Sequence, residues 1–291
     1  MIGILSAFGA SFAWTYACFI WRRNSFILEP IKLNLLKNLV AFLVFIPALF
    51  SVNFTQDTPY LLILLISGVL GIGIGDTFYI KSLKSIGTRK TLSIEAISPI
   101  IAAFSGGIFI KETLSLSSWI GILIVSLSLI KIITMRHTYL FRNSEDKTLK
   151  VNLTDYSYSF LSVLCAVIAA LLSRLVFIKT NLNPFQTTEL RLLGSIIFLI
   201  VVTKLKTNFS LSKFKNDERF WFLVSIIFGT NIGILLQQIV FKTLPLGIGW
   251  TLLSTSPLIS LLFVKKEEGE LSFEIILITL ILCIGIGLTI L

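Results

Sequence analysis

Long apolar runs separated by short polar stretches form the dominant pattern of the sequence. A helix needs about 20 consecutive, mainly apolar residues to cross a bilayer. Segments that meet this condition lie at about 3–21, 35–52, 60–80, 91–110, 116–134, 156–178, 185–203, 219–241, 246–264 and 271–291. The pattern therefore predicts an all-α membrane protein with ten transmembrane helices.

The longest polar stretch, at 135–155, divides these segments into two groups of five. We expect a first five-span repeat at 1–134, a polar linker at 135–155 and a second five-span repeat at 156–291. Residues that match in register are Gly71 with Gly229, Gly75 with Gly233, Lys84 with Lys242, Ser98-Pro99 with Ser256-Pro257, Glu112 with Glu270, Pro30 with Pro184 and Lys37 with Arg191. These matches indicate an internal repeat. Because five is odd, the second copy would enter the membrane from the opposite side, and such inverted repeats are typical of transporters.

The glycine-rich stretch GIGIGDTFYIKSLKSIG, at 71–87, allows two interpretations. A phosphate-binding loop would need a strand before it and a helix after it, and neither pattern is present. Gly71 and Gly75 form a GxxxG pair, as do Gly229 and Gly233. Within an apolar helix such a pair lets two backbones approach closely. We therefore expect the glycines to serve helix packing.

The composition agrees with a bilayer as the solvent. The chain is 55% hydrophobic and only 14% charged, whereas soluble domains carry about 25% charged residues. A net charge of +10 would suit a nucleic-acid partner. However, the bases lie at the ends of apolar runs, where they set membrane orientation instead. The first apolar run has no basic region before it, so we expect a retained span rather than a cleaved signal.

The residues that commonly build metal or catalytic sites are scarce. Cys18, Cys165 and Cys283 lie singly within apolar runs, and the single histidine, His137, lies in a loop. These residues cannot supply a zinc site, so we expect neither a metal nor a cofactor. No HExxH or GxSxG motif occurs, which argues against an enzyme. No ATP-binding motif occurs either, so any energy source is expected to be an ion gradient or the solute's own gradient.

The two groups of five segments, with Ser98-Pro99 and Ser256-Pro257 inside the fourth of each, resemble the drug/metabolite transporter superfamily and specifically its EamA-type carriers. Lys37 and Arg191 match a basic residue that is common in the second span of each half in that family. The stretch IIAAFSGGIFIKETLSLSSWIG after Pro99 is similar to the family's apolar run closed by an acid and a glycine. The resemblance covers nearly the whole chain. It implies transport of small metabolites such as amino acids, often outward.

The basic residues are unevenly divided between the two sides of the predicted membrane. Bases in loops after the first, third, fifth, seventh and ninth segments are Arg22, Arg23, Lys32, Lys81, Lys84, Arg89, Lys90, Lys131, Arg136, Arg142, Lys147, Lys150, Lys204, Lys206, Lys213, Lys215, Arg219, Lys265 and Lys266. The other side has only Lys111, Arg174, Lys179 and Lys242. Because cytoplasmic loops collect Lys and Arg, the bias predicts both termini outside, whereas EamA-type carriers are usually drawn with both inside.

Charged residues within apolar segments are the sharpest functional signal, since a central charge costs about 2.5–3.5 kcal/mol on insertion scales. Those residues are Lys37, Asp76, Glu95, Arg174, Glu189 and Arg191. They are expected either to form static salt bridges between helices or to bind a solute or proton. If the solute carries a carboxylate or phosphate, Lys37 and Arg191 are its counterions. Glu112 and Glu270, at segment ends, are expected to be solvated.

Further polar and aromatic residues complete the predicted site. Tyr79 lies one turn from Asp76, and Gln237 is its match in the second half. Trp14 and Tyr16 in the first segment could stack on an organic solute or simply pack. Trp250 shares one helical face with Ser254 and Pro257, as Glu95 does with Ser98 and Pro99 in the first half. The candidate substrate-binding residues are Trp14, Asn34, Lys37, Asp76, Tyr79, Glu95, Arg191, Gln237 and Trp250. An acid in a low-dielectric cavity can exchange a proton as the cavity opens alternately, which makes Asp76 and Glu95 the candidates for proton coupling.

The function that these patterns favour is a secondary transporter of a small organic metabolite, such as an amino acid or related solute. Its partners would be the solute, the lipid bilayer and a coupling ion or proton, with no nucleic acid. The chain is expected in the cell membrane as a monomer or homodimer. A structural or assembly protein without transport, and less so an intramembrane enzyme, remain the alternatives.

Overall fold

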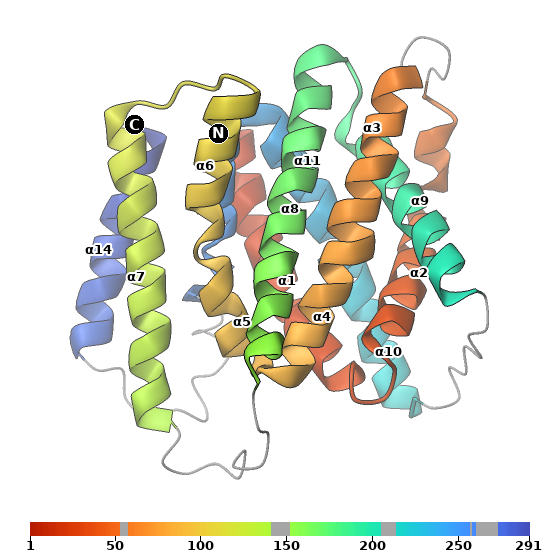
Figure 1. Cartoon of the computed structure of the whole chain (residues 1–291), viewed down its shortest axis with the longest axis horizontal. Coiled ribbons are helices and arrows are strands. Elements are labelled where there is room, and N and C mark those ends of the chain that lie inside the picture. Colours follow the sequence, from red (N-terminus) through yellow and green to blue (C-terminus); the bar gives the residue numbers. More distant parts are fainter. Residues whose placement is uncertain (53–57, 141–151, 205–213, 257, 260–272) are drawn as a thin grey trace.

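The computed structural model describes residues 1–52, 58–140, 152–204, 214–256, 258–259 and 273–291, and all regular elements in these ranges are helices. The helices stand side by side in one bundle (Figure 1). Both labelled ends of the chain lie at the same end of this bundle, which we call the termini end. Both termini therefore face the same way, as expected for an even number of crossings.

The first half contains α1 (Ile2–Asn24), α2 (Pro30–Leu49), α3 (Thr58–Gly68), η1 (Val69–Gly75), α4 (Asp76–Ser85), α5 (Gly87–Glu95), α6 (Ser98–Phe109) and α7 (Leu116–Leu140). The second half contains α8 (Leu153–Lys179), α9 (Pro184–Thr203), α10 (Asn216–Ser225), η3 (Ile226–Ile232), α11 (Gly233–Thr243), α12 (Leu246–Leu253) and α14 (Phe273–Ile290). The elements η1 and η3 are π-helices that continue the helices on either side of them.

Six helical stretches among the described residues are long and apolar enough to cross a membrane. They are Ile2–Asn24, Pro30–Leu49, Thr58–Ser85, Leu153–Lys179, Pro184–Thr203 and Asn216–Thr243. Shorter apolar helices lie at Ser98–Phe109, Leu116–Lys131 and Leu277–Ile290. The predicted segment at 246–264 lies partly outside the described residues. The all-helical membrane fold is thus confirmed, while the arrangement of ten spans as inverted repeats stays a prediction.

Two predicted boundaries need correction. The segment expected at 91–110 is not one continuous helix, because α5 ends at Glu95 and α6 begins at Ser98. Pro99 has no backbone N–H to donate to the Glu95 carbonyl, and its ring crowds that carbonyl. The connection between α7 and α8 is also shorter than the linker expected at 135–155, since α7 reaches Leu140 and α8 begins at Leu153. Residues 141–151 lie outside the described part.

The elements come in the same order in both halves. Helices α2 and α9 each contain 20 residues and each begin with proline. The π-helices η1 and η3 each contain seven residues and include the matched glycines Gly71 and Gly229. A π-helix is rare and is found mostly at functional sites. Two of them at matched positions indicate that this irregularity belongs to the design of each half.

The two halves contact each other through reciprocal helix pairs. Segments η1 and α4 pack on α8, while η3 and α11 pack on α1; α2 also packs on α9, and α7 on α14. A Cβ on Gly71 would lie 2.7 Å from the Ala169 Cβ, and one on Gly229 would collide with the Ala17 Cβ. Only glycine permits these approaches, so the predicted packing role of the glycines is confirmed.

Candidate functional site

A cavity of about 90 Å³ lies in the middle of the bundle, between elements of both halves. This volume can hold several water molecules. Its walls come from α1, η1, α4, α5 and α6 of the first half and from α8, α9, α11 and α12 of the second half. The predicted site residues that line it are Trp14, Asp76, Tyr79, Glu95, Arg191, Gln237 and Trp250. Seven side chains from six helices are thus brought to one place.

Lys37 and Asn34, the other two predicted residues, lie outside this lining. The Lys37 Nζ donates to Asp76 Oδ2 and lies 4.6 Å from the centroid of the Trp21 ring. The Lys37 side chain is fully buried, and that of Asp76 is 13% exposed. The charge of Lys37 is therefore already matched by an acid of its own half.

Asn34 holds the π-helix η1 in place. Its Nδ2 donates to the carbonyl oxygens of Ile72 (2.7 Å) and Gly73 (3.2 Å) and to Thr77 Oγ1 (3.0 Å). A π-helix leaves carbonyls poorly paired by its own backbone, and a buried carbonyl without a partner is costly. Asn34 therefore stabilises the segment that ends immediately before Asp76.

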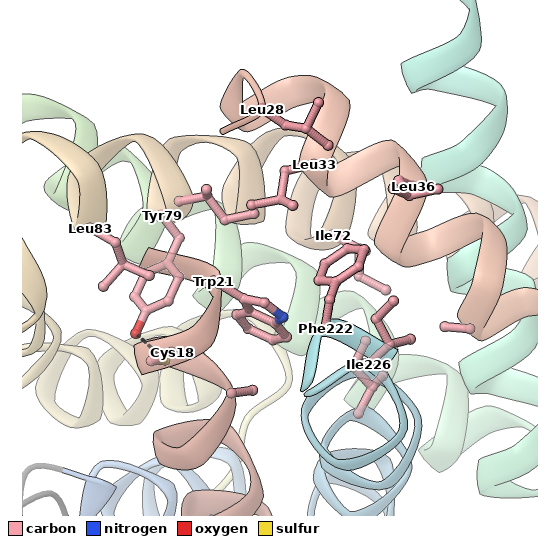
Figure 2. Close-up of a cluster of buried hydrophobic side chains, with 14 of the residues drawn as sticks. Cys18, Trp21, Leu28, Leu33, Leu36, Ile72, Tyr79, Leu83, Phe222 and Ile226 are labelled. Carbon is pink, nitrogen blue, oxygen red and sulfur yellow. Dashed lines mark hydrogen bonds between the residues drawn. The ribbon is translucent and has the colours of Figure 1, made fainter. Parts of the chain in front are cut away.

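Tyr79 is held by the first helix. Its hydroxyl lies 3.0 Å from Cys18 Sγ and accepts from Trp14 Nε1 at 3.4 Å. Figure 2 shows this hydroxyl turned toward Cys18, within the apolar cluster that includes Trp21 and Phe222. The Trp14 ring is 5.8 Å from Tyr79 and meets Trp21 edge to face at 5.3 Å. Both aromatic walls of the cavity are thus fixed by their neighbours.

Glu95 is the last residue of α5 and lies at the break before α6. It lines the cavity, and no hydrogen bond or ion pair joins its side chain to another described residue. The equivalent position in the second half, Leu253, ends α12 in the same way. There, Ser11 Oγ donates to the Leu253 carbonyl at 2.8 Å. The helix thus ends at matched positions in the two halves, but the residue there is an acid in the first half and a leucine in the second.

Arg191 brings a positive charge to the cavity from α9. The residue is 3% exposed, and its Nε and Nη1 find no acceptor among the described residues. A Cβ on Gly71 would lie 3.0 Å from Nη2, so that glycine also makes room for the guanidinium. Trp250 adds another indole N–H that lines the cavity without a partner in the described part. Donors from the second half thus face acids of the first half.

Sequence reasoning missed the small polar residues of the lining. Ser11, Ser98, Ser162, Ser254 and Ser256 all reach the cavity. Serine is common in membrane helices, where it bonds to its own backbone, so Ser11, Ser162 and Ser254 carried no signal, and Ser98 and Ser256 were identified only as part of the matched Ser-Pro pairs. Within the described residues, no group of three His, Cys, Asp or Glu side chains could hold a metal ion.

Comparison with known proteins agrees with this architecture. Residues 1–134 match the model of the EamA-like transporter family, which confirms the predicted resemblance. No curated protein matches the chain. A solved crystal structure of a protein is similar with a TM-score of 0.70 at 14% sequence identity, over 97% of this chain and 98% of that chain. At that identity the likeness shows the fold alone. The apolar helices, together with the family match over residues 1–134, indicate an integral, multi-pass membrane protein.

Proposed function

We propose that this chain, whose first half is that of an EamA-like transporter, is a secondary carrier. It moves a small organic solute through the central cavity by alternating access. The observation that carries the proposal is the cavity itself, because its walls come from both halves and include the matched segments α1 and α8, α4 and α11, and α5 and α12. Two halves that rock against each other would open such a cavity first to one side and then to the other.

The reciprocal contacts between the halves support the inverted-repeat part of the proposal. If η1 and α4 rest on α8 while η3 and α11 rest on α1, then swapping the conformations of the halves produces the opposite opening. The ten-span arrangement with 1–134 and 156–291 as repeats follows from the same symmetry.

The lining supports a solute that carries both an anionic group and a donor group, as amino acids and related metabolites do. Arg191 has two unpaired N–H groups for a carboxylate, and Glu95 is an acceptor without an ion-pair partner in the described part. Trp14, Tyr79 and Trp250 supply aromatic surface for the body of the solute. Glu95 is also the better candidate for proton coupling, since Asp76 is paired with Lys37.

Uptake into vesicles that contain the purified chain tests the function. The panel consists of amino acids, nucleosides and organic cations, assayed with and without a proton gradient. Ala166, which lines the cavity, offers a blocking variant. We expect saturable uptake of at least one solute and its loss in Ala166→Trp. Uptake that is the same in Ala166→Trp and in the unaltered chain would contradict transport through this cavity.

The proposed location is the cell membrane with both termini outside. The unequal distribution of loop bases supports this orientation. A C-terminal alkaline phosphatase fusion should be active, and a C-terminal green fluorescent protein fusion should be dark. The reverse pattern would place both termini in the cytoplasm.

A membrane-embedded structural protein is the second candidate. It would have no use for an unpaired guanidinium in an internal cavity, and Arg191 therefore favours the carrier. An intramembrane enzyme would need a nucleophile and base in contact, and the described lining offers no such pair. The test is again the uptake assay, because neither alternative predicts saturable uptake.

A further inference from the structure

Glu112, expected in solvent, is instead buried at the termini end of the bundle. It follows α6 in the connection to α7, which lies at that end in Figure 1. Its side chain is only 10% exposed, and its neighbour Arg174 is 15% exposed. A segment end in this family of folds therefore does not guarantee contact with water.

One carboxylate and one guanidinium join four segments here. Arg174 Nε donates to Glu112 Oε1 at 2.7 Å, and the backbone N–H of Leu246 donates to Glu112 Oε2 at 2.7 Å. Arg174 Nη1 also donates to the carbonyls of Phe241 (2.9 Å) and Lys242 (3.0 Å). We call this set of five residues the latch. It connects the α6–α7 link of the first half to α8, the end of α11 and the start of α12.

The latch lies beyond the cavity on the way to the termini end. On α8, Ala166 lines the cavity, and Arg174 follows eight residues later, which is about 12 Å along a helix. An apolar cluster that contains Val167, Ala170 and Leu252 extends from the cavity level, where it includes Ala10 and Leu253, to Phe241 and Leu246 of the latch. Buried apolar side chains therefore connect the cavity level with the latch.

At the opposite end, within the part of the chain that the structure describes, Arg23 and Glu218 form an ion pair across the halves at 2.8 Å, and the Arg23 side chain is 69% exposed. Exposed pairs contribute about 0–1 kcal/mol, whereas buried charge-assisted hydrogen bonds are stronger. The Glu112–Arg174 pair is thus expected to hold the halves together more firmly than the Arg23–Glu218 pair does.

We propose that Glu112 and Arg174 form the gate that keeps the cavity shut at the termini end, and that this gate opens in each transport cycle. The inference rests on the proposed carrier function. When α12 moves away from α6, Glu112 loses the Leu246 N–H and Arg174 loses the carbonyls at the end of α11. Both charges then face water that has entered the opening, so the separation leaves neither of them unsolvated.

Thiol accessibility tests this gate without knowledge of the solute. The three native cysteines are replaced, and Ser254→Cys in the cavity lining serves as the reporter. A membrane-impermeant maleimide is applied to sealed vesicles from the termini side or from the other side. We expect the reporter with an intact latch to react more slowly from the termini side. An equal or faster reaction from that side would overturn the proposal.

The latch variants sharpen the test. Glu112→Gln and Arg174→Gln should each raise the labelling rate from the termini side by about tenfold, as a shift in a two-state equilibrium does. Glu218→Gln, at the other end, is the matched control and should leave that rate within about twofold. Arg174→Lys keeps the charge but loses the second arm, and it serves if the neutral variants do not fold. Rates within twofold of the parent in every folded latch variant would contradict the gate.

Transport measured in parallel distinguishes failure of the gate from failure of the carrier function. Altered labelling without uptake of any solute would refute the carrier function and leave only the closure of the cavity by the latch. Uptake by a chain whose labelling ignores the latch would refute the gate and leave the carrier.

Discussion

Helices α2 and α9 occupy equivalent places in the two halves, and each has a base at its eighth position. In α2 that base is Lys37, which is fully buried, paired with Asp76 and outside the cavity lining. In α9 it is Arg191, which lines the cavity and keeps two N–H groups without a partner among the described residues. The two matched positions therefore hold an internal ion pair in one half and a guanidinium that lines the cavity in the other.

The difference comes from the neighbouring segment. The first residue of α4 is Asp76, whereas the matching position in the second half is Ile234. Lys37 pairs with an acid of its own half, whereas no ion pair joins Arg191 to an acid among the residues that the structure describes. Two helices of the same length can thus differ in one neighbouring residue, Asp76 against Ile234, and this difference accompanies a paired base in one and an unpaired base in the other. The predictions below test this contrast.

Neutralising Lys37 should have the largest effect on stability. Lys37→Gln leaves Asp76 buried without its partner, which costs about 3–5 kcal/mol. We expect a lower unfolding midpoint and a smaller monodisperse fraction in detergent. Lys32→Gln on the same helix breaks the exposed pair with Glu29 and should cost under about 1 kcal/mol.

The double variant Lys37→Gln/Asp76→Asn completes this experiment. Removing both charges should recover most of the lost stability, because no unpaired charge remains. If Lys37→Gln alone is as stable as Lys32→Gln, the ion pair is not structural and the contrast with Arg191 disappears.

Adding a methyl group at the matched glycines should have an intermediate and similar effect in both halves. Gly71→Ala meets Ala169, and Gly229→Ala meets Ala17, so each overpacks the contact at a cost of about 1–3 kcal/mol. Gly287→Ala is the control, since nothing lies within 4 Å of its added Cβ. Thermal unfolding measures the effect. A lower unfolding midpoint in only one of the two variants would show that the halves do not pack equivalently.

Neutralising Arg191 should affect binding far more than stability. Arg191→Gln removes a group whose Nε and Nη1 are unpaired in the described part, so the unfolding midpoint should stay close to that of the parent. Solute affinity should fall at least about tenfold, or 1.4 kcal/mol. Arg191→Lys keeps the charge but loses the planar fork and should recover part of the affinity. Normal affinity in Arg191→Gln would make this base structural as well.

The acid at the helix break should give the smallest change, confined to energy coupling. Glu95→Gln is expected to abolish proton-driven accumulation while exchange of solute across the membrane persists. Asp76→Asn combined with Lys37→Gln should retain coupling, because that pair is structural. Accumulation at parent levels in Glu95→Gln would remove Glu95 from the coupling step.

Much of the fold and part of the site could be predicted from the sequence. The apolar runs locate the helices because the bilayer demands a fixed length of apolar chain. The matched positions of Tyr79 and Gln237 in the two halves indicate a shared cavity, and both residues line the cavity in the structure. The glycine pairs were correctly assigned to packing, since a GxxxG pattern in an apolar helix has few other uses.

The interaction partners of the charged side chains could not be predicted from the sequence. Lys37 and Arg191 look equivalent in register, and only the three-dimensional structure shows that Asp76 is in direct ion-pair contact with Lys37 while it shares the cavity lining with Arg191. Glu112 follows a short polar turn that reads as solvent-exposed, yet Arg174 from the other half covers it. The π-helices have no sequence signature beyond glycine. Each of these features depends on contacts between the halves rather than on local preference.

The central claim is that one cavity, shared by the two halves, opens alternately to the two sides. Trans-stimulation measures this most directly: uptake of a labelled solute into vesicles is followed with and without the unlabelled solute inside. The account predicts faster uptake with solute inside, because a loaded carrier returns more readily, and loss of this stimulation in Ala166→Trp. Uptake that ignores the internal solute and rises linearly with concentration would indicate a pore and contradict the account.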